Sequence, residues 1–400
     1  MAERHVDTAA VHAGRLVVPQ NRASSPPLFQ ASSYEFDDLV EIAAIYAGER
    51  PGAVYGRYGG PNGSQFEAAM CELEGAPAAV GTSAGMAAID AALATNVAAG
   101  QTILATREVY GGTYALLEHD YRGRGIDVRY VDQGDIDAVR SALAQTDAKV
   151  LYVEALTNPL VHVADLPALA EAAHAAGAIL IVDATFVTPA LLRPFASGAD
   201  LVLHSVGKYL GGHGDVGAGV LAGRADLVAT ARAYLVRTGA TMPHFEAWLA
   251  LRGLRTLALR MERHSQNAVA VAAHLATLPV VGVVYHPSLV KHPQHELAAR
   301  LYPRGTGGIV AFDLASGDAR DVDRFLRGLE TIAIVHSLGE VATTISYPAV
   351  SSHRPLPPHA RRALGVGDAT LRISVGIEHP RDIIADLTRG FEGLGEPLRA

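Results

Sequence analysis

Cysteine, lysine and charged residues in general are scarce in this 400-residue sequence. Its single cysteine, Cys71, cannot form an internal disulfide or a thiolate zinc cage, which favours a reducing, cytoplasmic setting. Charged residues make up 18% and hydrophobic residues 49% of the chain, so disorder is excluded and we expect subunits that cover one another's apolar surface. The only lysines are Lys149, Lys208 and Lys291. Chemistry that needs a primary amine therefore has three candidates.

An excess of positive charge and long apolar runs are also missing. Lys and Arg together number 33 against 41 Asp and Glu, so the electrostatic attraction that drives binding to nucleic acid or to an anionic membrane is absent. The first residues, MAERHVDTAAVHAG, carry charges where a secretory signal needs an apolar stretch. No later run approaches the ~20 apolar residues of a membrane span. We expect no nucleic-acid partner, no membrane association and no bound metal.

Helical and apolar segments alternate from about residue 63 onwards. The apolar runs do not alternate in polarity, so they predict strands buried on both faces of a mostly parallel sheet that helices cover. The helix between two of them has Asp165 as its N-cap and ends before Gly177. The expected strands of this unit are 102–106, 126–131, 150–156, 178–186, 201–206 and 217–223. The fold class is therefore α/β.

The two ends of the chain have a different character. The first sixty residues hold turn-forming pieces without periodicity and are typical of an arm. A long helical segment, 244–277, leads into a smaller C-terminal unit, in which residues 354–365 predict a surface excursion and Pro380 begins the last helix. The strands expected in this unit are 308–314, 331–336 and 370–376.

The strongest local motif is HSVGKYLGGHGDVGAG, residues 204–219. Its glycines at 212, 214 and 217 match the G-x-G-x-x-G spacing of nicotinamide enzymes, but the motif would have to follow a strand at once and open a helix. Here Lys208 intervenes and a further apolar run follows, so a nicotinamide oxidoreductase is the remote alternative. A phosphate-binding P-loop fails because Tyr209 replaces the Ser or Thr that must follow the lysine.

Lys208 and Asp183 each lie where an apolar strand is expected to end. A lysine there is desolvated, which lowers its pKa and frees the amine to form a Schiff base; the alternative is a helix-end lysine that snorkels to solvent. A carboxylate at the carboxyl end of a parallel strand lies where ligands bind in such sheets, although it also serves as a structural cap. Together the two residues suit pyridoxal phosphate, since a buried carboxylate can pair with its protonated ring nitrogen. The helix beginning at Gly85 and Met86 offers amides to the phosphate.

With these pieces in place, the chain resembles the Cys/Met-metabolism family of pyridoxal-phosphate enzymes. That family includes cystathionine γ-lyases, cystathionine γ-synthases, methionine γ-lyases and O-acylhomoserine sulfhydrylases. The resemblance runs from about residue 11 to the last helix and rests on motifs that occur jointly and in order. They are YGR at 55, AGMAAI at 84, VYGGTY at 109, NP at 158, VDATFVTP at 182, HSVGKYLGGHGD at 204, LRGLRTLALRM at 251, SLG at 337 and LRISVGIE at 371.

The resemblance implies the fold-type-I architecture of aspartate aminotransferase relatives, with a large domain built on a mostly parallel sheet and a smaller C-terminal α/β domain. It implies three parts: an arm at 1–60 that reaches the neighbouring subunit's site, a pyridoxal-phosphate domain at 61–255 and a C-terminal domain at 256–400. It also implies a homotetramer, assembled as a dimer of dimers with shared active sites.

The resemblance further implies a role for each motif residue. Lys208 would carry the cofactor and transfer protons, Asp183 would hold its ring nitrogen, and Tyr110 would stack on the ring and act as acid or base. The phosphate would be bound by Gly85, Met86 and Ser205, joined by Tyr55 and Arg57 from the neighbouring chain. The substrate side would be formed by Asn158, which also contacts the ring hydroxyl, and by Arg372, Ser337 and His336.

The implied activity is elimination at the γ-carbon of a small sulfur-containing or O-activated amino acid, with γ-replacement as the alternative. A catalytically silent binding module is a rival of another class, which the joint presence of Lys208, Asp183 and Arg372 argues against. Gly112 stands where methionine γ-lyases usually carry a cysteine, and this argues against that activity. His336 stands where cystathionine γ-lyases tend to have Glu; it either reads a different distal group or fills space.

Overall fold

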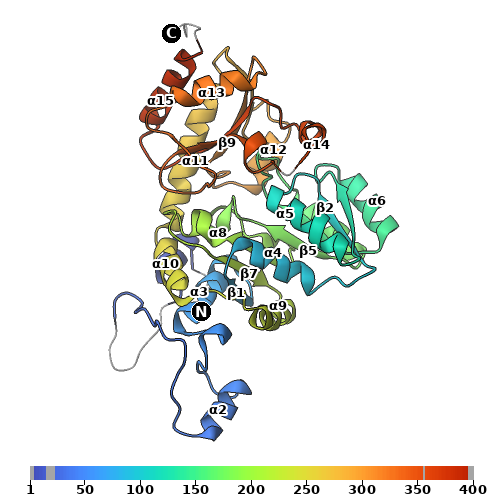
Figure 1. The fold of residues 1–400 in the computed structure, drawn as a ribbon, viewed down its shortest axis with the longest axis vertical. Helices are drawn as coiled ribbons and strands as arrows, with labels where there is room; N and C mark the ends of the chain where they lie inside the picture. Colours follow the sequence, from blue (N-terminus) through green and yellow to red (C-terminus); the bar gives the residue numbers. More distant parts are fainter. Residues whose placement is uncertain (1–3, 15–22, 355, 395–400) are drawn as a thin grey trace.

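The computed structural model describes residues 4–14, 23–354 and 356–394. Figure 1 shows two sheet-containing units along the long axis of the molecule, with the C-terminal unit at one end and the helix α2 at the other. The predicted α/β architecture is confirmed: a large, mostly parallel sheet is followed by a smaller α/β unit. None of the helices in the described ranges combines the length and apolar character needed to span a bilayer.

The larger sheet has seven strands in the order β1-β7-β6-β5-β4-β2-β3. The strands from β6 to β3 in this order pair in parallel, whereas β7 runs antiparallel to both of its neighbours. The six expected strands are all present, and β1 is an addition that the sequence did not predict. The strands are β1 (Ala78–Thr82), β2 (Thr102–Thr106), β3 (Asp127–Val131), β4 (Ala148–Glu154), β5 (Ile179–Asp183), β6 (Leu201–Ser205) and β7 (Gly219–Gly223).

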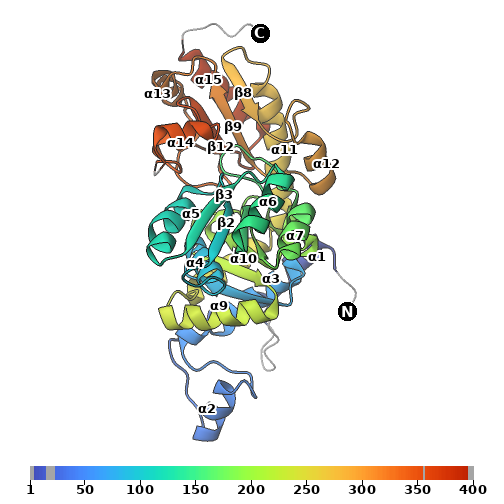
Figure 2. The same ribbon diagram turned by 90° about the vertical axis from the view of Figure 1, so that its right-hand side faces the viewer.

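Helices cover both faces of this sheet (Figure 2), so successive strand residues enter two different cores. In β4, Leu151 and Val153 pack in one core, and Val150 and Tyr152 pack in the other. The first core is closed by α1 (Val6–His12), α3 (Pro61–Glu74), α6 (Ile136–Thr146), α7 (Leu166–Ala175), α8 (Thr188–Leu191) and α10 (His244–Leu254). The second is closed by α4 (Gly85–Ala94), α5 (Gly111–Ala115) with its continuation η2 (Leu116–Tyr121), and α9 (Ala225–Thr238).

The helical segment expected at 244–277 is in fact two helices, α10 and α11 (Leu257–Leu275). The break has a local cause. The Gly253 carbonyl accepts hydrogen bonds from the Arg260 guanidinium at 2.9 Å and from the Thr256 hydroxyl at 3.3 Å. The Thr256 amide also donates to this carbonyl at 3.2 Å, so three donors share a group whose usual partner in a helix is the backbone amide four residues later.

The C-terminal sheet has the order β10-β11-β12-β9-β8. The helices α11, α13 and α15 pack against this sheet and share its core. Phe325 of α13 and Phe391 of α15 contact Phe312 of β9. The strand expected at 331–336 is reduced to two residues, β8 and β11 were not foreseen, and the excursion at 354–365 contains the helix α14. The elements are β8 (Val281–Tyr285), α12 (His295–Leu301), β9 (Ile309–Leu314), α13 (Ala319–Arg327), β10 (Ala333–Ile334), β11 (Thr344–Ser346), α14 (Pro358–Ala363), β12 (Thr370–Ser374) and α15 (Pro380–Glu392).

The segment before α3 leaves the body of the molecule, and both ribbon views show α2 (Leu39–Tyr46) standing apart from the two sheets (Figures 1 and 2). No residue of α2 is buried. The chain returns through a bridge between Ser33 and Tyr55 and the short helix η1 (Gly56–Tyr58). Residues 1–3 and 15–22 of the expected arm lie outside the described residues.

Candidate active site

The candidate site is a cavity of about 560 Å³ at the carboxyl ends of three neighbouring parallel strands. Glu154, Asp183 and Ser205 are the last residues of β4, β5 and β6, and all three line it. This is the edge at which open α/β sheets bind ligands. The lining also includes most of the residues expected from the sequence: Gly85, Met86, Tyr110, Asn158, Lys208, His336 and Arg372.

Lys208 lies in the tight turn Val206–Leu210 that follows β6, and its Nζ donates to Ser337 Oγ at 2.9 Å. Burial and the nearby charge of Arg372 lower the pKa of Lys208. The turn tolerates no side chain before the lysine, because a Cβ at Gly207 would lie 2.4 Å from the Val216 carbonyl oxygen. A residue with a side chain at position 207 therefore does not fit this backbone.

Asp183 and Glu154 form a pair of neighbouring carboxylates, since they face each other in the register of β4 and β5. Burial raises the pKa of Asp183, and burial together with the charge of Asp183 raises the pKa of Glu154 well above its usual range. Asp183 accepts a bond from the Thr185 amide at 2.9 Å, and the Tyr152 hydroxyl lies 3.5 Å away. Within the described ranges, no lysine or arginine pairs with Asp183, so a cationic N–H group from a ligand fits there.

The first turn of α4 forms a candidate anion site beside the end of β6. Ala84 has no side chain that could cap the helix, so its first amides are left for a ligand. Gly85 approaches Ser205 so closely that an added Cβ would lie 2.9 Å from the Ser205 Cβ. The amides of Gly85 and Met86 and the hydroxyl-bearing Ser205 thus gather at one end of the cavity, where a phosphate fits.

Arg372, on β12, is 2% exposed and crosses from the C-terminal unit to the larger one. Its Nη1 donates to Asn158 Oδ1 at 3.0 Å and its Nη2 to the Ser337 carbonyl at 3.2 Å, while its Nε has no partner among the described residues. Burial lowers its pKa to about 10. A buried guanidinium without a carboxylate partner suits a carboxylate ligand.

Tyr110 and His336 line the cavity from its two sides, and both are exposed at its surface. The Tyr110 ring packs over Gly112, where an added Cβ would lie 2.5 Å from ring carbon Cε1. A side chain at position 112, such as the cysteine usual in methionine γ-lyases, would therefore require the Tyr110 ring to move.

Tyr55 and Arg57 are not brought to this cavity by their own chain. Arg57 Nη1 donates to the Val236 carbonyl at 2.6 Å, and Arg57 lines a separate cavity of about 1260 Å³ beside α3 and the arm. Tyr55 is 46% exposed. Within a single chain, these two residues do not meet the residues expected to share the phosphate with them.

Sequence reasoning missed two features of the cavity. Glu154 is a carboxylate inside the apolar run 150–156, and this charge within a buried strand was the available signal. Arg354, next to Ser351 and Ser352 at the cavity's mouth, was assigned only to a surface excursion. The glycine run at 212–217 leads into β7 and not into a helix, so the structural context of a nicotinamide site is absent there.

Comparison with known proteins places these features in a family. Residues 7–392 match the family described as Cys/Met metabolism PLP-dependent enzyme. An O-succinylhomoserine sulfhydrylase of Pseudomonas aeruginosa is 41% identical over 97% of this chain and 95% of that protein. An L-methionine γ-lyase of Porphyromonas gingivalis is 37% identical over 97% of each chain. The crystal structure of a cystathionine γ-synthase from Xanthomonas oryzae in complex with cystathionine matches with a TM-score of 0.92 and 37% identity, covering 98% of this chain and 99% of that one.

Proposed function

The chain belongs to the Cys/Met metabolism family of pyridoxal-phosphate-dependent enzymes, and from that premise we propose that it removes the γ-substituent of a small amino acid. The substrate class is sulfur-containing or O-activated amino acids, such as cystathionine or a homoserine ester. One observation carries the proposal: Lys208, an amine of lowered pKa, lines the same cavity as Asp183, a carboxylate that no lysine or arginine of the described residues pairs with.

The residues of the cavity fit pyridoxal phosphate. Lys208 would bind it covalently, Asp183 would hold the protonated ring nitrogen, and the α4 amides with Ser205 would hold the phosphate. Tyr110 would cover one face of the ring, and Asn158 would contact the ring hydroxyl. When bound, the cofactor supplies an electron-withdrawing pyridinium that stabilises negative charge on the substrate's α-carbon.

The chain's own residues would bind the substrate and move its protons. Arg372 offers a planar fork to the α-carboxylate, and its hydrogen bond to Asn158 fixes the orientation of that fork. The Lys208 amine, whose lowered pKa favours the neutral form, takes the α-proton at Nζ. After a second deprotonation at the β-carbon, the Tyr110 hydroxyl assists the departure of the γ-substituent. The γ-substituent leaves with a proton, and the addition of one water molecule to the remaining four-carbon fragment then yields 2-oxobutyrate and ammonia.

The arm and the assembly are part of the same proposal. Tyr55 and Arg57 lie away from the cavity of their own chain, and α2 stands apart from the body. A second copy could therefore receive them at its phosphate end, in a dimer of dimers with shared sites. The single cysteine supports a reducing compartment, for which the cytoplasm is the simplest choice.

Replacement at the γ-carbon is a second candidate, because the mouth of the cavity carries the cationic side chain of Arg354. Its two carboxylates, Glu154 and Asp183, lie at the strand ends, whereas Arg354 and His336 lie at the exposed rim. Among the described residues, the Arg354 side chain has no hydrogen-bond or ion-pair partner. Such a rim suits the distal carboxylate of an acyl group, as in an O-succinylhomoserine, which a thiol would displace.

A substrate panel tests both candidates. The holoenzyme is given L-cystathionine, L-methionine, L-homocysteine, O-acetylhomoserine or O-succinylhomoserine, with and without an added thiol, and is assayed for 2-oxo acid and for new thioether. We expect 2-oxo acid from at least one substrate without thiol. Thioether formed only with thiol, and no 2-oxo acid, would replace elimination by γ-replacement. No turnover of any member would overturn both.

A further inference from the structure

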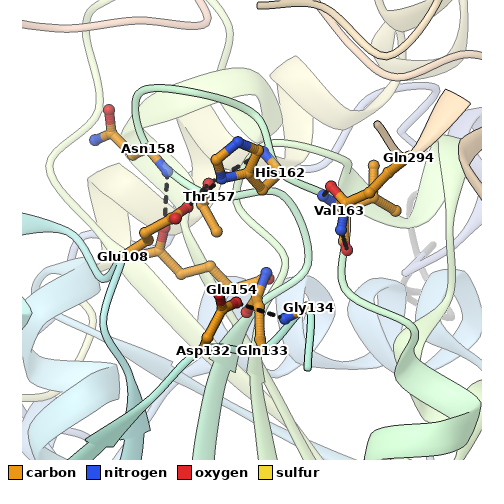
Figure 3. Close-up of polar contacts among 10 residues, drawn as sticks. All are labelled: Glu108, Asp132, Gln133, Gly134, Glu154, Thr157, Asn158, His162, Val163 and Gln294. Carbon is orange, nitrogen blue, oxygen red and sulfur yellow. Dashed lines mark hydrogen bonds and ion pairs between the residues drawn. The ribbon is translucent and has the colours of Figure 1, made fainter. Parts of the chain in front are cut away.

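A polar network behind the cavity joins the segment that carries Tyr110 to the loop that carries Asn158 (Figure 3). Two carboxylates make the connection. Glu154 accepts the Tyr110 amide at 2.5 Å and the Asn158 amide at 3.1 Å, one on each carboxylate oxygen. Glu108 accepts the Thr157 hydroxyl at 2.8 Å and lies 2.6 Å from His162 Nδ1, with the same oxygen facing both.

The loop after β4 closes on itself, and its two sides are bound by different side chains. Thr157 and His162 pair across it, because the Thr157 amide donates to the His162 carbonyl at 3.0 Å and the His162 amide to the Thr157 hydroxyl at 3.1 Å. Val161 between them has a φ of 52°, a conformation that a β-branched residue adopts only when its surroundings impose it. At the far side, Gln294 binds both backbone groups of Val163 at 2.6 and 2.7 Å.

Glu108 is therefore a second side-chain anchor of this loop beside Glu154, and it holds Thr157, the residue next to Asn158. Glu108 also precedes Tyr110 by two residues, so the backbone that carries Glu108 leads directly to Tyr110. The bond from Asn158 to Arg372 extends the effect to the guanidinium. We propose that Glu108 is a positioning residue, which through Thr157 and His162 sets the spacing of Asn158 and Tyr110 in which the cofactor's ring is held. This proposal rests on the proposed function.

The charge state of His162 controls how firmly Glu108 is held. Burial lowers the pKa of His162, but the hydrogen bond and charge of Glu108, with the charge of Asp132, outweigh it and raise that pKa above its usual value. His292, whose ring centre lies 6.1 Å from that of His162, has its pKa lowered to about 4 by burial and its histidine neighbours, so it stays neutral. The ion pair is present below the raised pKa of His162 and is lost as the pH rises through it.

The test uses one variant for each member of the network. Glu108→Gln removes the charge, Thr157→Val removes the hydroxyl, and His162→Arg keeps a cation at every pH. Asp127→Asn is the control, since it removes a carboxylate from an exposed ion pair on β3, where Asp127 lies 2.8 Å from Arg129. Each holoenzyme is measured for its dissociation constant for pyridoxal phosphate, its visible absorbance against pH, its kcat and its KM.

We expect Glu108→Gln and Thr157→Val to weaken cofactor binding and lower kcat by roughly 3-fold to 10-fold each, as one charged or neutral hydrogen bond predicts. Both variants should also shift the pH midpoint at which the visible absorbance band of the bound cofactor changes, while KM changes little. His162→Arg should retain tight binding to higher pH than wild type, and Asp127→Asn should match wild type throughout.

Unchanged cofactor affinity, band midpoint and kcat in folded Glu108→Gln would overturn the proposal. The proposal would also be overturned if Glu108→Gln had a lowered melting temperature but the spectrum and cofactor affinity of wild type, since that result assigns Glu108 a structural role only. Cofactor affinity and the visible band need no turnover, so a wild-type enzyme that binds pyridoxal phosphate but processes none of the panel refutes the proposed function and leaves this test intact.

Discussion

Replacing Lys208 by alanine separates the chemistry of this site from its folding. The change removes the amine that would bind the cofactor and move the α-proton, so we expect turnover to fall below detection. Free amines in solution do not restore the geometry, because Lys208 Nζ is fixed by its bond to Ser337 Oγ at 2.9 Å. Cofactor that still enters the cavity should lose the absorbance of a covalent adduct.

The same substitution should leave the cofactor-free protein stable. It deletes one hydrogen bond, which contributes about 0.5–1.5 kcal/mol, and it also removes a cation whose burial is unfavourable. These two effects oppose each other, so the free energy of unfolding at neutral pH should change by no more than about 1 kcal/mol. A structural lysine in a favourable ion pair would be costlier to lose.

The pH dependence gives a sharper test, because the sign is fixed by the lowered pKa. Between that pKa and the ordinary value of 10.5, folded Lys208 is neutral while the unfolded chain still binds the proton. The stability of the wild type should therefore rise with pH in this window, relative to Lys208→Ala, by about 1.4 kcal/mol per pKa unit of lowering. Urea unfolding of both cofactor-free proteins from pH 7 to 10 measures the difference.

Two outcomes would refute this reasoning. Full activity in Lys208→Ala would remove the residue from the chemistry. A wild type whose stability relative to the variant falls with rising pH in that window would mean that the folded protein favours the charged amine. The reading of Lys208 as a buried, neutral nucleophile would then be wrong, even if the variant were inactive.

Three further substitutions address the other walls of the cavity. Asp183→Asn should cost about 2–5 kcal/mol of cofactor binding by removing the partner of the ring nitrogen; a dissociation constant equal to that of wild type, measured by fluorescence, would contradict this. Arg372→Lys should raise KM by roughly 10-fold to 100-fold while the fold is kept, because the ammonium cannot make two parallel bonds; an unchanged KM speaks against carboxylate binding there. Arg354→Gln should lower kcat/KM for O-succinylhomoserine about 5-fold relative to O-acetylhomoserine, as an exposed ion pair of about 1 kcal/mol predicts; equal ratios in both proteins exclude this contact.

The elements that the sequence predicted well are those with a strong local signal. Five of the six apolar runs of the large sheet are buried on both faces, the exception being β3 with its exposed Arg129, and α7 begins at its Asp165 cap. Of the missed strands, β1 reads AAVGT, with small residues of low strand propensity, and β11 has only three residues. β8 reads VGVVY, and its valines and tyrosine were an available strand signal. The break between α10 and α11 depends on Arg260 reaching a carbonyl, which no periodicity encodes.

The site shows the same division between local motif and long-range geometry. The sequence motifs identified Lys208, Asp183 and Arg372 as candidate site residues, and the fold brings all three to one cavity. The connections among them were not predictable, because they join residues far apart in the chain, such as Arg372 to Asn158 and Glu108 to His162. Each such contact depends on the loop after β4, whose closed turn is fixed by tertiary hydrogen bonds.

The ionisable groups of the cavity form a basic pair and an acidic pair, and this arrangement explains why the binding of cofactor and the binding of substrate should favour each other. Like charges are neighbours on each side: Lys208 and Arg372 each have a lowered pKa, whereas Glu154 and Asp183 each have a raised one. A ligand with a cationic ring N–H and an aldehyde would offset the carboxylates and consume the amine, and a substrate carboxylate would then neutralise the arginine. Because each partner removes a cost present in the empty protein, binding should stabilise the fold by mass action. The first ligand should also raise the affinity of the second, because the aldehyde of the bound cofactor gives the substrate's amine a partner in the same cavity.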